Sequence, residues 1–209
     1  MRDKKIWIFN AGNAFDGNPK WLFMYIVNYR KDITPYWFCY TEETRNYIRK
    51  LGYQAFLFKS KMAEKIGSQA GVYVVNQKKE VFQDYLKGIT VLNLWHGVGC
   101  KTVEKGVTYG FLNERIIKKH IINMDCYQNY QLFLVTSPLM EKHFIKQCDL
   151  AEDKIIRAGY PCCFYPGKIK TYDHDILKQK KLPEDTKIAV YAPTYRDASA
   201  TNFFSQAIP

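Results

Sequence analysis

IWIFNAGNAFDGNPKWLFMYIVNYRKDITPYWFCY, residues 6–40, is the stretch that decides the fold. It begins with an apolar run at residues 6–9, which is typical of a buried strand. The helical pattern that follows has Asn18 as its cap and Pro19 at its first position. A second apolar and aromatic run at residues 36–40 indicates the next strand. A strand, a helix and another apolar strand in this order predict a parallel pair joined by a crossover.

The same alternation continues along the chain. Thr41 can cap the next helix. Glu42 and Glu43 suit the positive end of the dipole of this helix, and Gly52 ends it. A shorter helical pattern covers residues 62–66. Further strands are predicted at residues 55–58, 72–75, 91–95, 132–135 and 155–157. Apolar strands separated regularly by helices are typical of a parallel sheet covered on both faces. We therefore predict a doubly wound, mostly parallel, Rossmann-like α/β fold.

The domain organisation follows from a change in composition near residue 165. Residues 1–165 are predicted to form one Rossmann-like domain. Residues 166–186 contain Pro166, Gly167 and a lysine-rich stretch, so we interpret them as a linker. An apolar run at residues 187–191 indicates a new strand. A second domain needs on the order of 100 residues, so residues 187–209 are expected to be only its beginning.

Composition and charge limit the function classes. The chain has 209 residues, of which 47% are hydrophobic and 24% charged, and these values are ordinary for a globular protein. No stretch approaches the ~20 apolar residues that span a bilayer, and the first apolar run is too short for a signal peptide, so we expect a cytoplasmic protein. The net charge of +11 favours anionic partners, which include phosphorylated substrates, nucleic acid and an anionic membrane surface. The six cysteines are scattered and show no metal-binding spacing.

The segment LNLWHGVGCK, residues 92–101, is the strongest candidate for a reactive site. His96 follows a predicted strand, where ligands of open α/β sheets bind. Gly97 and Gly99 would allow backbone amides to approach an anion, and Lys101 adds a positive charge. These residues suit a general base beside a phosphorylated donor. The alternative is a histidine that simply ends the strand, although that role requires neither the glycines nor the lysine.

Other histidines and polar residues near the predicted strand ends have open alternatives. His120, His143 and His174 lie in polar contexts and are expected at the solvated surface. Lys20 could steer an anionic acceptor or be an ordinary helix-start lysine. Asp16 could orient the imidazole or close an Asp-Gly turn. For Thr194 and Arg196 the alternatives are binding of a pyrophosphate and a surface turn.

Four motifs resemble the CDP-glycerol glycerophosphotransferase family, the teichoic-acid primases and polymerases. They are AGNAFDGNPKWLFMYI from residue 11, LWHGVGCK from residue 94, AGYP from residue 158 and YAPTYRD from residue 191. The resemblance implies the N-terminal half of a GT-B-type enzyme, with an acceptor-side first domain and a donor-binding second domain. It also implies that His96 is the general base in transfer of glycerol phosphate, or ribitol phosphate, from CDP-glycerol or CDP-ribitol.

The resemblance further implies where and with what the protein works. The acceptor would be a lipid-linked polyol phosphate or glycan, and the enzyme would lie peripherally on the inner face of the cell membrane during teichoic acid biosynthesis. The family commonly has His-Gly-Thr-Pro where this chain has His-Gly-Val-Gly at residues 96–99. The family's second-domain residues would lie beyond residue 209, so we expect a fragment that lacks most of the donor site.

Two other functions remain open from the sequence. A GT-B sugar-nucleotide glycosyltransferase would share the architecture and differ only in its donor. A basic nucleic-acid-binding module would explain the charge, but the aromatic residues fall mainly inside predicted strands, so no nucleic acid partner is expected. No cofactor or metal ligand is assigned, and the need for a divalent metal stays open.

Overall fold

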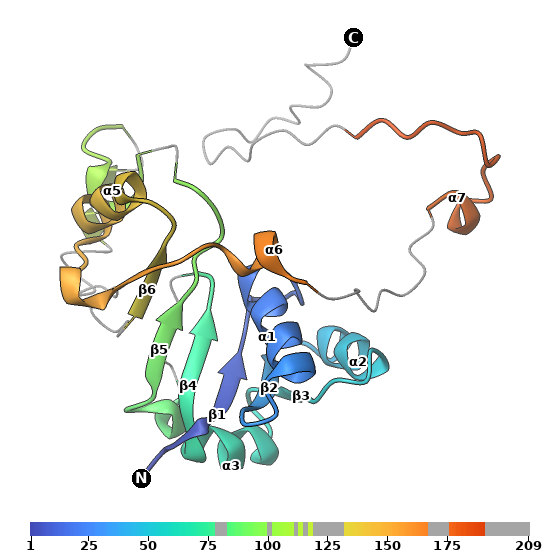
Figure 1. Cartoon of the computed structure of the whole chain (residues 1–209), viewed down its shortest axis with the longest axis horizontal. Coiled ribbons are helices and arrows are strands. Elements are labelled where there is room, and N and C mark those ends of the chain that lie inside the picture. Colours follow the sequence, from blue (N-terminus) through green and yellow to red (C-terminus); the bar gives the residue numbers. More distant parts are fainter. Residues whose placement is uncertain are drawn as a thin grey trace. The chain divides into compact units, whose positions relative to one another are not determined.

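A seven-stranded parallel sheet forms the centre of the computed structural model (Figure 1). The structure describes residues 1–77, 83–99, 102–110, 113–114, 117–118, 132–166 and 176–190. The strands lie in the order β3-β2-β1-β4-β5-β6-β7, and each neighbouring pair is parallel. Their bounds are β1 Asp3–Phe9, β2 Thr34–Cys39, β3 Ala55–Leu57, β4 Ala70–Val75, β5 Thr90–Asn93, β6 Leu132–Val135 and β7 Ile155–Arg157.

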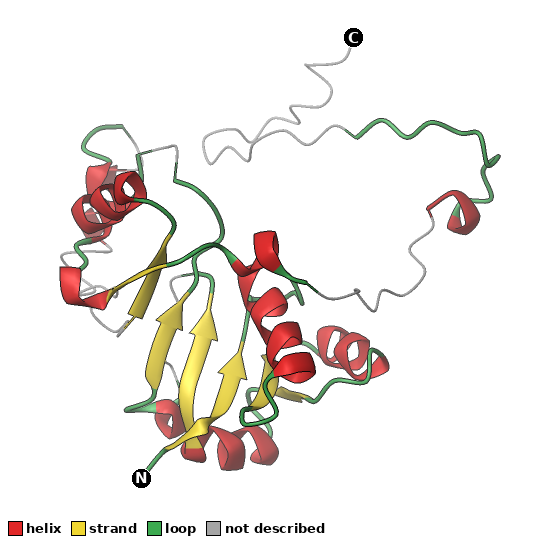
Figure 2. Ribbon diagram, viewed as in Figure 1, coloured by secondary structure: helices red, strands yellow, loops and turns green. Residues whose placement is uncertain are grey.

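Helices cover both faces of this sheet (Figure 2). The ring of Phe9 packs 5.4 Å from that of Phe23 on α1, and Phe133 packs 5.2 Å from Phe144 on α5. The register pairs connect Phe9 to Leu132 through the intervening strands, so these two side chains lie on the same face of the sheet. Phe133 is the next residue and therefore lies on the opposite face. The predicted doubly wound, Rossmann-like fold is therefore confirmed. The helices are α1 Gly17–Tyr29, α2 Glu42–Lys50, α3 Lys61–Gln69, α5 Pro138–Cys148, α6 Pro161–Phe164 and α7 Ile176–Gln179.

Hydroxyl side chains cap α2, α3 and α5, as the sequence predicted for Thr41 at the start of α2. The Thr41 hydroxyl accepts the N–H of Thr44 at 3.3 Å, and Gly52 has φ 85° just beyond the end of α2. The prediction for α1 was wrong in its first residues. This helix begins at Gly17 with Asp16 at the cap position, so Asn18 lies inside it. The Asn18 side chain is buried and bonds backbone groups outside its own helix, which makes it unavailable as a cap.

All seven strands predicted before the linker are present, and three end earlier than expected, of which β2 ends at Cys39. β3 ends at Leu57, and β5 ends at Asn93 because the backbone turns at Trp95, which has φ 53°. The strand predicted at residues 187–191 does not form over residues 187–190, and Tyr191 lies outside the described residues. An extended segment becomes a strand only when a neighbour takes its backbone hydrogen bonds, and no described strand pairs with these residues.

A cluster of aromatic rings fills the layer between α1 and the sheet. Phe15 packs edge-on against Trp37 at 4.6 Å, and Phe23 contacts Trp37 at 5.7 Å and Tyr53 at 5.4 Å. Phe9, Phe23 and Trp37 are fully buried. Edge-to-face contacts of this kind add to the free energy gained from burial. The cluster fixes α1 on the sheet and thereby sets where the loop before it lies.

The chain divides into two compact units, residues 1–170 and 171–209. The first contains the sheet. In the second, the described residues form the short helix α7 and an irregular segment up to residue 190. The linker at residues 166–186 and the second domain from residue 187 remain predictions. Of the helices that the structure describes, none is both long and apolar enough to cross a membrane.

Candidate functional site

His96 lies three residues beyond the last residue of β5, at the carboxyl end of the sheet. The N–H of Leu94 still bonds the carbonyl oxygen of Val75 at 2.8 Å, so the backbone follows the sheet up to that point. The positive φ of Trp95 then turns the chain away. The imidazole of His96 is exposed and stacks on the ring of Trp95, with centroids 4.4 Å apart. The indole thus forms a platform that leaves the imidazole open to solvent.

A pocket of about 170 Å³ adjoins this imidazole. Its walls come from the residues after β5 and from helix α5, and they are mostly apolar. A site at this edge agrees with the rule that open α/β sheets bind ligands beyond the carboxyl ends of their strands. The lining residues are Trp95, His96, Val98, Gly99, Val103, His143 and Phe144.

Partial burial lowers the pKa of His96 below its ordinary value of 6.5. The cause is desolvation, since the stacked indole and the pocket wall replace water that would stabilise the imidazolium. A lower pKa keeps the ring neutral at neutral pH. A neutral imidazole that is exposed on one side can accept a proton from a bound hydroxyl group.

His143 is a second histidine at the pocket, and the prediction of a solvated surface position for it was wrong. It lies on α5, half-buried, with its Nδ1 2.8 Å from Nε2 of Gln147 and its ring edge-on to Phe144 at 5.0 Å. Its polar neighbours in the sequence suggested exposure. Its spacing from Met140 on the same helix was the available signal, because Met140 is buried and residues three apart lie on the same helix face.

The two glycines after His96 have different surroundings. At Gly97, an added Cβ would meet no atom of the described residues within 4 Å, so the approach to this backbone is open. At Gly99, an added Cβ would lie 2.7 Å from Nε2 of His143. The N–H of Gly99 points to the sulfur of Met140 at 3.2 Å. Gly97 therefore fits the expected approach of an anion, whereas Gly99 is needed for close packing against α5.

Lys20 and Asp16 lie at the start of α1. The Lys20 ammonium is 5.5 Å from the ring of Phe15 and 5.3 Å from that of Trp21, and burial lowers its pKa while Asp16 raises it. Asp16 is exposed at the cap position, with no side-chain cap bond among the described residues. Gly17 has φ 60°, as the Asp-Gly turn interpretation predicts. Lys101, Thr194 and Arg196 lie outside the described residues.

Two buried side chains that the sequence did not predict at the site contact the His96 loop. The amide nitrogen of Asn18 donates to the carbonyl oxygens of Trp95 at 2.9 Å and Leu94 at 3.3 Å. The Tyr160 hydroxyl donates to the carbonyl oxygen of Gly97 at 2.8 Å. Both residues fall within the quoted motifs, but their partners are distant in sequence, so only the folded structure shows the contacts.

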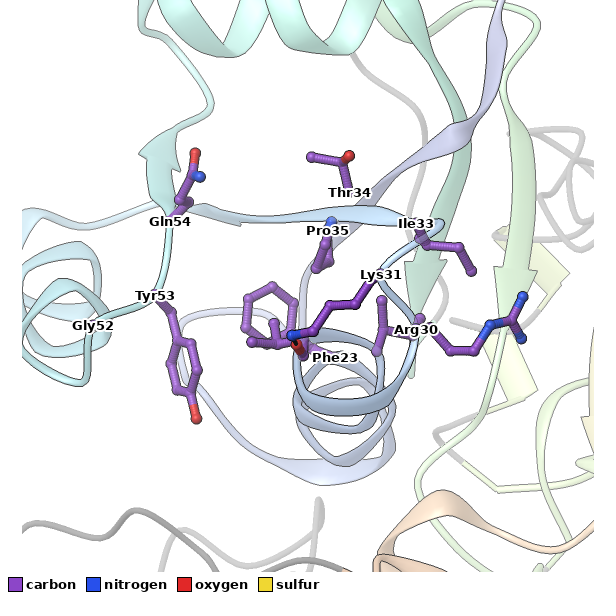
Figure 3. Close-up of a pocket in the computed structure, with 11 residues that line it drawn as sticks. Phe23, Arg30, Lys31, Ile33, Thr34, Pro35, Gly52, Tyr53 and Gln54 are labelled. Atoms are coloured by element: carbon purple, nitrogen blue, oxygen red, sulfur yellow. Dashed lines mark hydrogen bonds between the residues drawn. The ribbon is translucent and has the colours of Figure 1, made fainter.

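A larger pocket of about 240 Å³ lies at the opposite ends of the strands (Figure 3). Thr34 and Pro35, which line it, begin β2, so this pocket is at the amino ends of the strands. Arg30 beside it already pairs with Asp32, and the Lys31 ammonium donates to the carbonyl oxygen of Val27. Sheets of this class bind ligands at the carboxyl ends of their strands, and this pocket lies at the amino ends. The pocket at His96 is therefore the candidate site.

No described residues gather three His, Cys, Asp or Glu side chains in a position to hold a metal ion. The arrangement of strands, with an exposed histidine beside a pocket at their carboxyl ends, defines a Rossmann-like α/β domain with its candidate site at the edge where such folds bind ligands. The family model described as CDP-Glycerol:Poly(glycerophosphate) glycerophosphotransferase matches residues 1–208, so the chain belongs to this family. The resemblance expected from the four motifs is confirmed.

Solved structures of the wall teichoic acid polymerase TagF are similar to this chain. One superposes with a TM-score of 0.69 at 20% identity and covers 94% of this chain and 49% of TagF. A TagF variant with one histidine changed to asparagine, studied after a 15 minute soak with CDPG, gives a TM-score of 0.70 at 19% identity, with coverages of 94% and 49%. The chain thus spans about half the length of these TagF structures. The search of curated proteins found no match.

Proposed function

We propose that the chain provides the acceptor side of a transferase that moves glycerol phosphate from CDP-glycerol to a teichoic-acid-type acceptor, with His96 as the general base. The observation that carries this proposal is the exposed His96 imidazole, which lies beside a pocket at the carboxyl end of β5 and has a lowered pKa. Membership of the glycerophosphotransferase family supports the substrate class.

The proposed step is a phosphoryl transfer in which atoms and charges balance. The terminal hydroxyl of the acceptor gives its proton to a ring nitrogen of His96, and its oxygen attacks the β-phosphorus of CDP-glycerol. The new P–O bond forms while the bond from this phosphorus to the bridging oxygen breaks, and CMP leaves with the electron pair. The imidazolium then releases its proton to solvent. A positioned base of this kind contributes roughly 10²–10⁴-fold to the rate.

The other candidate residues are proposed to bind the phosphates or to support the site. The open backbone at Gly97 allows an anion to come close, and Lys20 supplies positive charge at the start of α1. Lys101, Thr194 and Arg196 are proposed to bind phosphate groups. Gly99 supports the site through its packing against His143, and Asp16 through the turn that begins α1.

The acceptor is proposed to be lipid-linked, with the protein held peripherally on the inner face of the membrane. The net charge of +11 supports this location, because each basic residue near an anionic surface contributes about 1 kcal/mol to binding. Flotation with vesicles that contain or lack anionic lipid tests it. Equal binding to both kinds of vesicle would contradict a charge-driven association.

The test of the reaction measures CMP release from CDP-glycerol in the presence of a glycerol phosphate oligomer, using the polypeptide in the longest form that its gene encodes. His96→Ala is expected to lower turnover by roughly 10²–10⁴-fold, and His143→Ala, which changes the same pocket, by less than about tenfold. Wild-type turnover by His96→Ala would remove His96 from the mechanism. Release of nucleotide from CDP-ribitol or a sugar nucleotide, but not from CDP-glycerol, would reassign the donor.

A further inference from the structure

The bend that presents His96 has a backbone conformation that needs support. Trp95 has φ 53°, in the left-handed region that bulky side chains rarely adopt. Residues persist in such conformations only where the surrounding structure holds them, and they cluster at functional sites. The groups that hold Trp95 in this conformation therefore also help to set the position of the His96 imidazole, which stacks on it.

Asn93 holds the bend from the side of the strand. It is the last residue of β5 and is fully buried. Its side-chain oxygen accepts the N–H of Trp95 at 2.8 Å, in the manner of an Asx turn. The N–H of the preceding residue, Leu94, still bonds the carbonyl oxygen of Val75 in the neighbouring strand. The Asn93 side chain thus supplies the bond at the first position where the sheet no longer does.

Asn18 holds the same residue from the side of helix α1. Its side-chain nitrogen donates to the carbonyl oxygen of Trp95 at 2.9 Å, and the side chain is only 2% exposed. Its side-chain oxygen accepts the N–H of Cys162 at 3.4 Å, which connects the bend to α6. The N–H and the carbonyl of Trp95 are thus each bound by a buried asparagine.

The side-chain nitrogen of Asn93 has no hydrogen-bond partner among the described residues. A buried donor without a partner destabilises a fold, and an apolar or hydroxyl side chain at this position would avoid that cost. The nitrogen of this side chain therefore gives no reason for an asparagine here. The oxygen of the same amide, which binds Trp95, gives the residue its role.

We propose that Asn93 and Asn18 are positioning residues, which clamp the two backbone groups of Trp95 and so fix the direction in which the His96 ring faces the pocket. This inference rests on the proposed function, because it gives the fixed direction a catalytic purpose. Neither asparagine has to touch substrate. Their loss is expected to change the orientation and solvation of the imidazole while the rest of the sheet stays folded.

The test compares Asn93→Thr with Asn93→Val, which have the same shape and both lack the unpaired amide. The threonine hydroxyl can accept the N–H of Trp95, and valine has no acceptor. In Asn93→Val, we expect the Trp95 amide to exchange with solvent at least tenfold faster, and the NMR titration of the His96 ring to move up toward an ordinary histidine value. Turnover should fall at least tenfold with little change in the KM for CDP-glycerol. Asn93→Thr should stay close to the wild type in all three.

Two further variants make the result decisive. Asn18→Asp keeps the shape and the acceptor for Cys162 but loses both donors, so it should also lower turnover at least tenfold. His96→Gln assigns the NMR signal and tests the proposed function separately, because wild-type turnover by that variant would refute the role of His96 whatever the clamp does. Equal turnover and equal His96 titration in Asn93→Val and Asn93→Thr, with His96→Gln inactive, would overturn the positioning role alone.

Discussion

Replacing Gly99 by alanine is expected to destabilise the protein, whereas the same change at Gly97 is not. A Cβ at residue 99 would lie 2.7 Å from Nε2 of His143, compared with an ordinary contact of 3.4–4 Å. The His143 ring cannot move away easily, because Gln147 bonds its Nδ1 and Phe144 packs against it. Overpacking of this kind costs about 1–3 kcal/mol of the free energy of unfolding. For a chain of this size the melting temperature should fall by roughly 2–10 °C.

Chemical denaturation followed by circular dichroism measures this difference, and a double-mutant cycle locates its cause. In a His143→Ala background the two closest contacts of a Cβ at residue 99 are gone and the contact with Cζ of Phe144 at 3.3 Å remains, so Gly99→Ala should cost less there, below about 1 kcal/mol. Gly97→Ala should stay within about 0.5 kcal/mol in the wild-type background. An equal cost of Gly99→Ala with and without the His143 ring would refute the packing explanation.

Two other predictions concern groups away from the pocket. The Arg2 guanidinium donates to the carbonyl oxygens of Gly67, Ala70, Tyr85 and Lys87. Arg2→Met should therefore lower the free energy of unfolding by about 2 kcal/mol, and Arg2→Lys should lower it by less. A loss below about 0.5 kcal/mol in Arg2→Met would contradict this prediction. Burial raises the pKa of Cys39 to about 12, so mass spectrometry after iodoacetamide treatment at pH 8 should find it unmodified in the folded protein, while the exposed Cys163 reacts. Equal labelling of the two would show that Cys39 is accessible.

The fold was predictable because its information is local. Apolar runs of strand length between helical patterns predict a parallel sheet covered on both faces, and caps such as Thr41 mark where a helix begins. The end of β5 was not predictable in the same way. Residues 91–95 are apolar except for Asn93, and the turn at Trp95 depends on a side-chain bond and on a distant helix.

The candidate site was predictable in part. His96 could be singled out because a histidine and glycines followed a predicted strand, which is where such sheets bind ligands. The structure gives Gly99 a packing role, and it brings His143, Asn18 and Tyr160 to the site. Asn18 bonds Trp95, which is 77 residues away, and Cys162, which is 144 residues away. Tyr160 bonds Gly97, which is 63 residues away, and His143 packs against Gly99 from another element. Periodicity and spacing describe one element at a time, so they carry no signal for such contacts.

In the proposed reaction the neutral imidazole of His96 takes the proton of the acceptor hydroxyl. The most direct measurement compares the pH dependence of kcat/KM for CMP release with the NMR titration of the His96 ring in the same protein. Burial lowers the pKa of this ring, so protonation should remove the base only below pH 6.5. If His96 is the base, kcat/KM should be constant above this pKa, fall below it, and have its midpoint where the ring titrates. A His96 titration with no matching change in kcat/KM would contradict the role of His96 as the base.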